Sequence, residues 1–237
     1  MARLARLVIP DLPHHVTQRG NRRERTFFED SDYALYLDLL AYAARRAHAE
    51  VWCYCLMPNH VHIVVVPSDE DGLRRTFRYV HRHYTGFINA NARMRATGHL
   101  WQGRFGSVAM DEAHLYNAFR YVSLNPVRAG LVKRAQDWAW SSVGAHLAGE
   151  DDHVVKVAPA LDRIGDFAAF LDEPIDEAGA FAGLRKAEAV GRPIGSIEWI
   201  KAMEERLGMK LAPGKRGPAP KIRGAVREIQ GLLHLSP

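Results

Sequence analysis

The stretch that most restricts the fold is VWCYCLMPNHVHIVVVP, residues 51–67. Two short apolar runs, rich in valine and aromatic residues, lie on either side of Pro58 and Asn59. Runs of this length bounded by turn residues are typical of strands, and a Pro-Asn pair favours a reversal of the chain. The sequence therefore predicts a β-hairpin made of residues 51–58 and 60–67, apolar enough to be buried.

The elements around this hairpin define a topology. Apolar residues at helical spacing, possible capping residues and glycine-rich breaks locate them. They are a strand at 14–20, a helix from Ser31 or Asp32 to about residue 50, a helix from Leu73 to about Met94, an extended segment at 98–110, and a helix from Asp111 or Glu112 to Leu124. The order β-α-β-β-α-β-α predicts an α+β fold: a ferredoxin-like split β-α-β antiparallel sheet, covered on one face by helices.

Differences in amino-acid composition along the chain predict three segments. Residues 150–190 hold ten acidic and four basic side chains, so we expect this segment to stay away from any phosphate backbone. We predict a core domain at 1–149 and a mainly helical C-terminal extension at 150–212. A basic, partly flexible tail follows at 213–237, because its Pro, Gly and Lys content cannot bury a core.

The chain also carries signs of its compartment. It has no run near the ~20 apolar residues that a membrane span requires and no apolar leader, so we expect a cytoplasmic protein. Cys53 and Cys55 are two apart in one strand and would share a face, which is a poor arrangement for a disulfide. Two buried thiols in a reducing compartment fit this spacing.

Arginine and aromatic residues alternate between Gly72 and Met110, where seven arginines occur without one acidic residue. Arginine for phosphate and aromatic rings for base stacking are what a single-stranded nucleic-acid surface requires. A solvated helix face is the alternative, and for Trp101 the alternative is a place in the core. The candidate DNA contacts, with basic residues from the first strand, the following turn and the tail included, are Arg19, Arg22, Arg74, Arg78, Arg82, Trp101, Gln102, Arg104, Lys215 and Arg216.

His60 and His62 open the second strand of the hairpin. Residues i and i+2 of a strand point to the same face, about 6–7 Å apart. Two neutral imidazoles could therefore bind one divalent metal ion if a third protein group came from elsewhere. The alternative is a pair of polar residues at a solvated strand end.

The helix that follows offers such a group. On a helical wheel one stripe carries His114, Asn117, Tyr121 and Asn125, opposite an apolar stripe. Asn125 could supply an oxygen ligand, and mixed nitrogen and oxygen ligation suits Mg²⁺ or Mn²⁺. Tyr121 could act as a nucleophile, or it could be a half-buried core tyrosine. His114 could touch DNA or the outer shell of the metal, or simply be an exposed polar residue.

Five motifs together resemble one family. PNHVHIVV resembles the His-hydrophobe-His motif of the HUH endonucleases, and RYVSLNPVRAGLV resembles the nucleophile helix of the IS200-type single-tyrosine transposases. HVTQRGN, GHLWQGRF and DWAWSS strengthen the likeness to the branch of REP-associated tyrosine transposases, where REP denotes repetitive extragenic palindromes. The resemblance covers roughly residues 8–148 and keeps the motifs in the family's order.

The resemblance implies an enzyme that cuts single-stranded DNA beside palindromic, REP-like hairpins. In that family the tyrosine, here Tyr121, joins the 5′ side of the break as a phosphotyrosine and leaves a free 3′-OH. His60, His62 and Asn125 would be the ligands of Mg²⁺ or Mn²⁺. Insertion-sequence members commonly have glutamine where this chain has the shorter Asn125. The resemblance favours a monomer, with a homodimer possible.

Two other functions remain open from the sequence. A domesticated protein could bind the hairpins without cutting them, and such a protein would not need His60, His62, Tyr121 and Asn125 intact. A metal-dependent phosphodiesterase could use activated water instead, and Tyr121 would then be dispensable.

Overall fold

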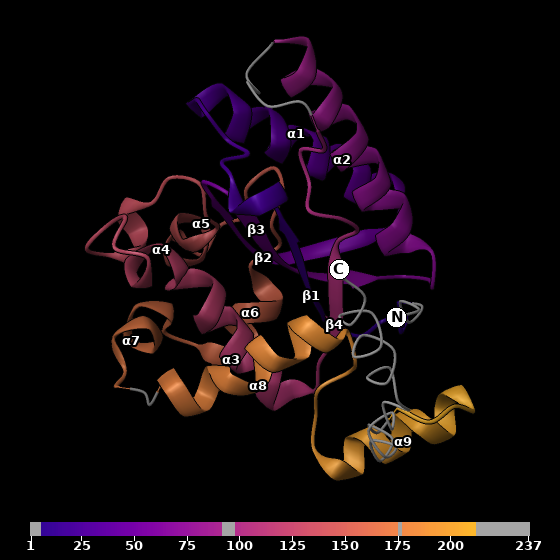
Figure 1. The fold of residues 1–237 in the computed structure, drawn as a ribbon. Helices are drawn as coiled ribbons and strands as arrows, with labels where there is room; N and C mark the ends of the chain where they lie inside the picture. The colour runs from indigo at the N-terminus through magenta and orange to yellow at the C-terminus, as the bar shows by residue number, and fades with distance from the viewer. Residues whose placement is uncertain (1–5, 92–97, 175–176, 212–237) are drawn as a thin grey trace, which may run out of the picture.

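Four antiparallel strands form the centre of the fold (Figure 1). They lie in the order β2-β3-β1-β4, so the outer strands enclose the pair β3 and β1. Their bounds are His14–Arg19 for β1, Ala49–Met57 for β2, His60–Pro67 for β3 and Gly106–Ala109 for β4. This confirms the split β-α-β arrangement. The computed structural model describes residues 6–91, 98–174 and 177–211.

Helices lie on both sides of the sheet. In Figure 1, α1 and α2 lie side by side beyond one face, while α3, α6 and α8 lie beyond the other. Short 3-10 turns occur at Asn21–Arg23 and Ala135–Asp137. The bounds are Asp30–Arg46 for α1, Gly72–Ala90 for α2, Glu112–Ser123 for α3, Asn125–Arg128 for α4, Val143–Ala148 for α5, Ala158–Ile164 for α6, Phe167–Asp172 for α7, Glu177–Val190 for α8 and Ile197–Leu207 for α9.

The alternation of β3 explains why two layers of helices are needed. Val61, Ile63 and Val65 point into a core shared with α1 and α2. Val64, on the opposite face, packs into a second core with the buried residues of α3 and α8. The expectation of helices on one face alone was therefore wrong, because strands that are apolar on both faces must be covered on both.

Some boundaries differ from the sequence-based expectation. The helix expected to reach Met94 ends at Ala90, and residues 92–94 lie outside the described part of the chain. The extended segment at 98–110 gives the sheet only four residues, with an isolated bridge from Trp101 to Gly20 before them. Helix α3 ends at Ser123, and a separate short helix begins at Asn125, with a proline in its first turn, where proline is tolerated.

The C-terminal extension is helical, as expected, and it contributes to both cores. Val155 forms a bridge with Val51 of β2 and is buried in the first core. Phe167, Phe170, Phe181 and Leu184, from α7 and α8, are buried in the second. Helix α8 also contacts α3 and β4 directly. The extension therefore covers the sheet face that carries Val64.

Two further expectations concern the cysteines and membranes. Cys53 and Cys55 are free thiols, both fully buried on the same face of β2. Among the helices of the described residues, none combines the length and apolar character that crossing a bilayer would require.

His14 anchors the segment that precedes β1. Its imidazole is completely buried, its Nδ1 donates a hydrogen bond to the carbonyl of Leu12 (2.8 Å), and its Nε2 accepts one from the amide of Ile9 (3.1 Å). Burial lowers the pKa of His14 to about 4. The native state therefore holds this ring neutral in the pH range where an unfolded histidine takes up a proton.

We expect this buried histidine to make folding stability depend on pH. Above about pH 6.5 its contribution is complete, and it is lost as the pH falls from about 6.5 towards 4, because only the unfolded state binds the proton. One such proton changes the free energy of unfolding by up to about 1.4 kcal/mol per pH unit. Urea unfolding at several pH values measures the slope, and His14→Gln should flatten it. An identical slope in the variant would contradict the assignment.

Candidate active site

Two histidine rings lie together at the start of β3. His60 and His62 project from the sheet face opposite Val61, and their ring centroids are 4.9 Å apart. They line a cavity of about 590 Å³ that opens between β1, the loop before β4 and α8. The other residues that line it are Thr17, Gln18, Arg19, Gln102, Gly103, Arg104, Gly106, Arg185 and Glu188.

The ring of His60 is oriented by its neighbour in the hairpin turn. The side-chain amide of Asn59 donates from Nδ2 to the carbonyl of Arg23 (2.9 Å), which directs its Oδ1 towards His60. That oxygen lies 2.6 Å from Nδ1 of His60. Because a carboxamide oxygen can only accept, Nδ1 of His60 carries the proton, and Nε2 keeps its lone pair.

The ring of His62 is oriented by His15, a residue of β1. His62 pairs with Thr17 in the register of β1 and β3, which places His15 diagonally beside it. The Nε2 atom of His15 lies 3.0 Å from Nδ1 of His62, and the two ring planes differ by 18°. In His62, as in His60, the Nδ1 atom therefore forms a hydrogen bond with another protein side chain.

Both cavity histidines are held neutral. Burial lowers the pKa of His60 to about 4, with a smaller effect from the charge of Arg19. Burial also places the pKa of His62 well below its usual value, and it lowers that of His15 to about 3. A neutral imidazole is the form that binds a metal ion, so these rings need lose no proton at neutral pH.

Glu188, from α8, is the carboxylate of the cluster. Its Oε1 lies 3.5 Å from Nδ1 of His15 and 4.0 Å from Nδ1 of His62. Burial raises the pKa of Glu188 to about 7, against the charges of Arg19, Arg128 and Arg185, which lower it. Ligand atoms of His15, His62 and Glu188 all lie within 4.8 Å of one another, a grouping that could hold a metal ion.

Tyr121 packs beside these histidines from α3. Its ring centroid is 5.4 Å from that of His62 and 5.8 Å from that of His15, in both cases edge to face. On its other side lies Phe181 of α8. The guanidinium of Arg128 lies 4.1 Å above the tyrosine ring and donates to the backbone carbonyl of Tyr121 (3.0 Å). The side chain is only 8% exposed, and it lines a shallow surface hollow.

The charge around Tyr121 works in two directions. Burial, together with the carboxylate of Glu188, raises the pKa of the phenol. The positive charges of Arg128 and Arg185 lower it. The phenol of Tyr121 is therefore protonated at neutral pH. The positive charges of Arg128 and Arg185 would stabilise negative charge that develops on its oxygen.

Asn125 lies in the same hollow as Tyr121, which Arg128, Ala129 and Arg185 also line. Its side chain is 9% exposed, and no hydrogen-bond partner for its Nδ2 occurs among the described residues. Helix α3 ends between Tyr121 and Asn125, so the two residues share this hollow but belong to different helices. The structure shows no direct contact of Asn125 with His60 or His62, and its role as a ligand stays a prediction.

The candidate DNA contacts fall into several places. Arg19, Gln102 and Arg104 are exposed and line the histidine cavity, whereas Arg22 is exposed in the turn after β1. Trp101 is 9% exposed and packs in the first core, the alternative that the sequence had left open. Lys215 and Arg216 lie outside the described residues.

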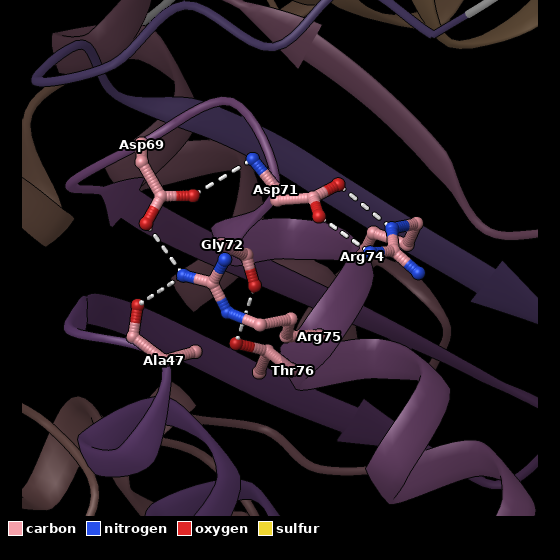
Figure 2. Close-up of polar contacts among 7 residues, drawn as sticks. All are labelled: Ala47, Asp69, Asp71, Gly72, Arg74, Arg75 and Thr76. Atoms are coloured by element: carbon pink, nitrogen blue, oxygen red, sulfur yellow. Dashed lines mark hydrogen bonds and ion pairs between the residues drawn. The ribbon is translucent and has the colours of Figure 1, made fainter.

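The arginines of α2 differ in their surroundings. Figure 2 shows Arg74 bound to Asp71 and Arg75 bound to Asp69 at the start of the helix. Arg78 and Arg82 lie one and two turns further on, both exposed, and together with Tyr79 and His83 they line a surface groove. The first turn of α2 therefore has its positive charge neutralised locally.

Three further residues lie away from the cluster. His114 forms a hydrogen bond between its Nδ1 and Asp111 (2.6 Å) at the start of α3. Tyr84 is completely buried and donates to the carbonyl of Thr26 (2.6 Å), while Tyr116 packs edge to face on Phe170. Of Tyr84, Tyr116 and Tyr121, only Tyr121 contacts the histidine cluster.

Sequence reasoning missed His15, Arg128, Arg185 and Glu188. The alternation in HHVTQRG places His15 and Thr17 on one face of β1, yet only the register of β1 with β3 brings that face beside His62. Glu188 and Arg185 lie in the acidic segment that we expected to stay away from a phosphate path. Helix α8 itself carries two acidic and two basic side chains; it buries Phe181 and Leu184 and presents Arg185 and Glu188 to the cavity.

The residues of the cluster fit a divalent metal ion. Both cavity histidines have Nδ1 occupied by a protein group, so their Nε2 atoms are the nitrogens left to ligate. Asn125, which lines the same hollow as Tyr121, offers an oxygen donor, whereas Glu188 faces the Nδ1 side of His62. Two nitrogens with one or two oxygens is a donor set suited to Mn²⁺ or Mg²⁺.

Part of this chain is similar to known proteins. Residues 9–125 match the family model described as "Transposase IS200 like", a segment that contains His60, His62, Tyr121 and Asn125. A Haemophilus influenzae protein named as a REP-associated tyrosine transposase is 28% identical over 110 residues, which are 43% of this chain and 62% of that protein. The REP-associated tyrosine transposase of Escherichia coli is 23% identical over 129 residues, 54% of this chain and 74% of the relative.

A solved structure has a similar fold. A REP-associated tyrosine transposase bound to a REP hairpin superposes with a TM-score of 0.54 at 22% identity, over 66% of this chain and 92% of the other. At 22% identity this similarity shows that the two proteins share a fold. With the matched segment and its motifs, it leads to one conclusion. Through residues 9–125, this chain is similar to the IS200-like transposase family.

Proposed function

We propose that the protein is a metal-dependent single-stranded DNA endonuclease and strand transferase that works through a 5′-phosphotyrosine intermediate. The observation that carries this proposal is the contact of Tyr121 with His62 inside a buried cluster. That cluster places a potential nucleophile beside His62, whose ring in turn contacts His60, the second neutral imidazole. Similarity to a transposase family supports the same chemistry.

His60 and His62 would hold the ion, Mg²⁺ or Mn²⁺, with Asn125 as the expected oxygen ligand. When bound there, such an ion supplies Lewis-acid polarisation of a phosphate oxygen. The fit rests on the Nε2 atoms of the two histidines, which make no hydrogen bond among the described residues, and on the Oδ1 atom of Asn125, the one atom of that side chain able to ligate.

Tyr121 would make the new bond. Its phenol oxygen attacks the scissile phosphorus, a bond from tyrosine to phosphorus forms, and the bond from phosphorus to the 3′ oxygen breaks. The proton that the phenol loses balances the one that the departing 3′-OH gains. Arg128 and Arg185, whose charges lower the pKa of Tyr121, favour the phenolate character of the attacking oxygen. Attack by another 3′-OH on the phosphotyrosine reverses the step and rejoins strands.

The proposed substrate is single-stranded DNA with a palindromic, REP-like hairpin. The two relatives are named for association with such repeats, and the solved neighbour is bound to a REP hairpin. The exposed Arg19, Gln102 and Arg104 around the cavity are of the types that contact phosphates and bases.

The direct experiment uses the full chain and a hairpin oligonucleotide with a labelled 3′ flank. With Mn²⁺ or Mg²⁺, a labelled protein band should survive denaturation, because the label downstream of the cut follows the 5′-phosphotyrosine. A cleaved but unattached product would favour hydrolysis by water. Binding without any cleavage would favour a hairpin-binding protein and overturn the proposal.

The arginines of α2 provide a graded test of DNA binding. We expect Arg78→Ala and Arg82→Ala each to weaken single-stranded DNA binding several-fold and to lower the salt dependence by about one released counterion. Arg74→Ala should have a smaller effect, because Asp71 already neutralises Arg74. Fluorescence anisotropy titrations at several salt concentrations measure both quantities. Arg134→Ala, another arginine paired with an aspartate, is the matched control. Equal effects in all four variants would contradict this assignment.

A monomer is the form we propose. The candidate nucleophile and both histidines come together within one chain, since Tyr121 contacts its own His62. Mixing Tyr121→Phe with His60→Ala should therefore not restore activity, whereas a dimer with shared sites would regain part of it. Adduct formation in the mixture, measured alongside the molecular mass by light scattering, decides between the two.

A further inference from the structure

The structure assigns a positioning role to His15 and Glu188: Glu188, through His15, fixes the tautomer of His62 that leaves Nε2 free for a metal ion. This inference rests on the proposed function for its purpose. Glu188 lies on α8, beyond the residues 9–125 that match the family model, so the comparison itself assigns nothing to it.

The first link is the contact between the two imidazoles. Nε2 of His15 and Nδ1 of His62 are 3.0 Å apart, their planes are within 18° of parallel, and both rings are almost completely buried. One nitrogen must donate and the other must accept, because two N–H groups or two lone pairs would repel each other at 3.0 Å. Only if His62 donates from Nδ1 does its Nε2 keep the lone pair that a metal requires.

The second link decides which ring donates. Oε1 of Glu188 faces Nδ1 of His15 at 3.5 Å, a few tenths of an ångström longer than a formed hydrogen bond. Within the described residues both atoms are buried without any hydrogen-bond partner. If His15 donated from Nε2, its Nδ1 lone pair would face an oxygen of ionised Glu188, and two buried acceptors would oppose each other. A proton on Nδ1 of His15 satisfies both atoms.

The proton arrangement then follows along the chain. Nδ1 of His15 donates towards Glu188, Nε2 of His15 accepts from Nδ1 of His62, and Nε2 of His62 stays unprotonated. Asn59 performs the same task for His60 in a single step, through its Oδ1. The two cavity histidines are thus prepared by different elements: one by the hairpin turn, the other by β1 and α8.

The position of α8 is held by packing that does not involve Glu188. Phe181 and Leu184, one to two turns earlier, are buried in the second core, and Phe181 packs against Tyr121. Replacement of Glu188 therefore leaves the main anchors of the helix in place. The C-terminal extension becomes part of the active site, because it supplies the group that orients a ligand.

The test reads the tautomers directly in the metal-free full chain. Long-range ¹H–¹⁵N correlation spectra of histidine-labelled protein distinguish protonated Nδ1 from protonated Nε2. We expect His60 and His62 both to be protonated at Nδ1. In His15→Phe, which keeps a ring but removes both nitrogens, His62 should change to the Nε2-protonated form that a free imidazole favours, while His60 stays unchanged.

Variants at Glu188 separate positioning from direct metal ligation. Glu188→Gln keeps an oxygen that can accept from His15, so the tautomer of His62 should persist and Mn²⁺ affinity should stay within a few-fold of wild type. Glu188→Ala removes the acceptor and should lower Mn²⁺ affinity by about 10–100-fold, as is typical when an outer partner of a ligand is lost. Titrations followed by electron paramagnetic resonance measure the affinity, with Lys186→Ala on the same helix as control.

Each outcome bears on a different claim. If His62 carries its proton on Nε2 in wild type, or if its tautomer is indifferent to His15→Phe, the positioning role is overturned. An affinity loss in Glu188→Gln as large as in Glu188→Ala also overturns it, because it would mark Glu188 as a direct ligand. Absence of Mn²⁺ binding in wild type would contradict the proposed function alone, since the tautomers are observed without metal.

Discussion

Tyr121→Phe should eliminate the covalent DNA–protein adduct and lower strand cleavage by at least about a thousandfold, the scale expected when a nucleophile is removed. The substitution deletes one oxygen and retains the ring. Its contacts with His62, Phe181 and the guanidinium of Arg128 are made by the ring and so persist. We therefore expect unchanged hairpin binding and a melting temperature close to wild type.

Tyr116→Phe is the control for this experiment. Tyr116 lies on the same helix but packs against Phe170 of α7, away from the histidine cluster. Its variant should cleave and form adduct like wild type. The assay is a denaturing gel of labelled hairpin DNA after incubation with Mn²⁺. An adduct that persists in Tyr121→Phe would remove the proposed nucleophile from the mechanism.

His60→Ala should also lower strand cleavage strongly, because it weakens metal binding. Removal of this imidazole leaves one histidine of the pair, so Mn²⁺ affinity should fall by at least about 10–100-fold, and cleavage with it. His60 is the more exposed of the two cavity histidines, so its truncation should disturb the fold less than that of His62. Hairpin binding should persist, because the exposed arginines that would contact DNA are unchanged.

Chelation supplies the matching chemical test. EDTA should abolish cleavage by wild type, and added Mn²⁺ should restore it. The control variant is His153→Ala, an exposed histidine that pairs with Asp38 away from the cavity. Calorimetry of Mn²⁺ binding and gel assays of cleavage provide the two readings. Cleavage by His60→Ala at the wild-type rate, or cleavage in EDTA, would contradict a metal site at these histidines.

The antiparallel sheet and its split β-α-β arrangement followed from the sequence because the signals were local, whereas the place of β2 at the edge of the sheet did not. The hairpin at residues 51–67 and the helices on either side each carry their own periodicity, and the split β-α-β order leaves little freedom in how they pair. The second layer of helices was not foreseen. The sequence of β3 is apolar on both faces, which indicates burial on two sides. It does not indicate which segment covers the second side.

The site shows the same division between local and distant information. His60 and His62 share a face because they are two apart in a strand, and this is a property of the strand alone. His15 comes beside His62 only through the register of β1 with β3. Glu188 arrives from a helix more than a hundred residues later in the chain, within an acidic segment whose overall charge pointed away from DNA. The net charge of a segment sums over all of its side chains, whereas the site contains only the side chains on one face of α8.

One measurement tests the central claim most directly, namely the identity of the residue joined to DNA. The trapped adduct is digested with nuclease and trypsin, and the peptides are analysed by mass spectrometry. Trypsin separates Tyr116 from Tyr121, because cleavage after Arg120 divides FGSVAMDEAHLYNAFR from YVSLNPVR. We predict that the nucleotide mass resides on YVSLNPVR, at Tyr121. A nucleotide on any other peptide, or cleavage that proceeds with no modified peptide, would contradict the account.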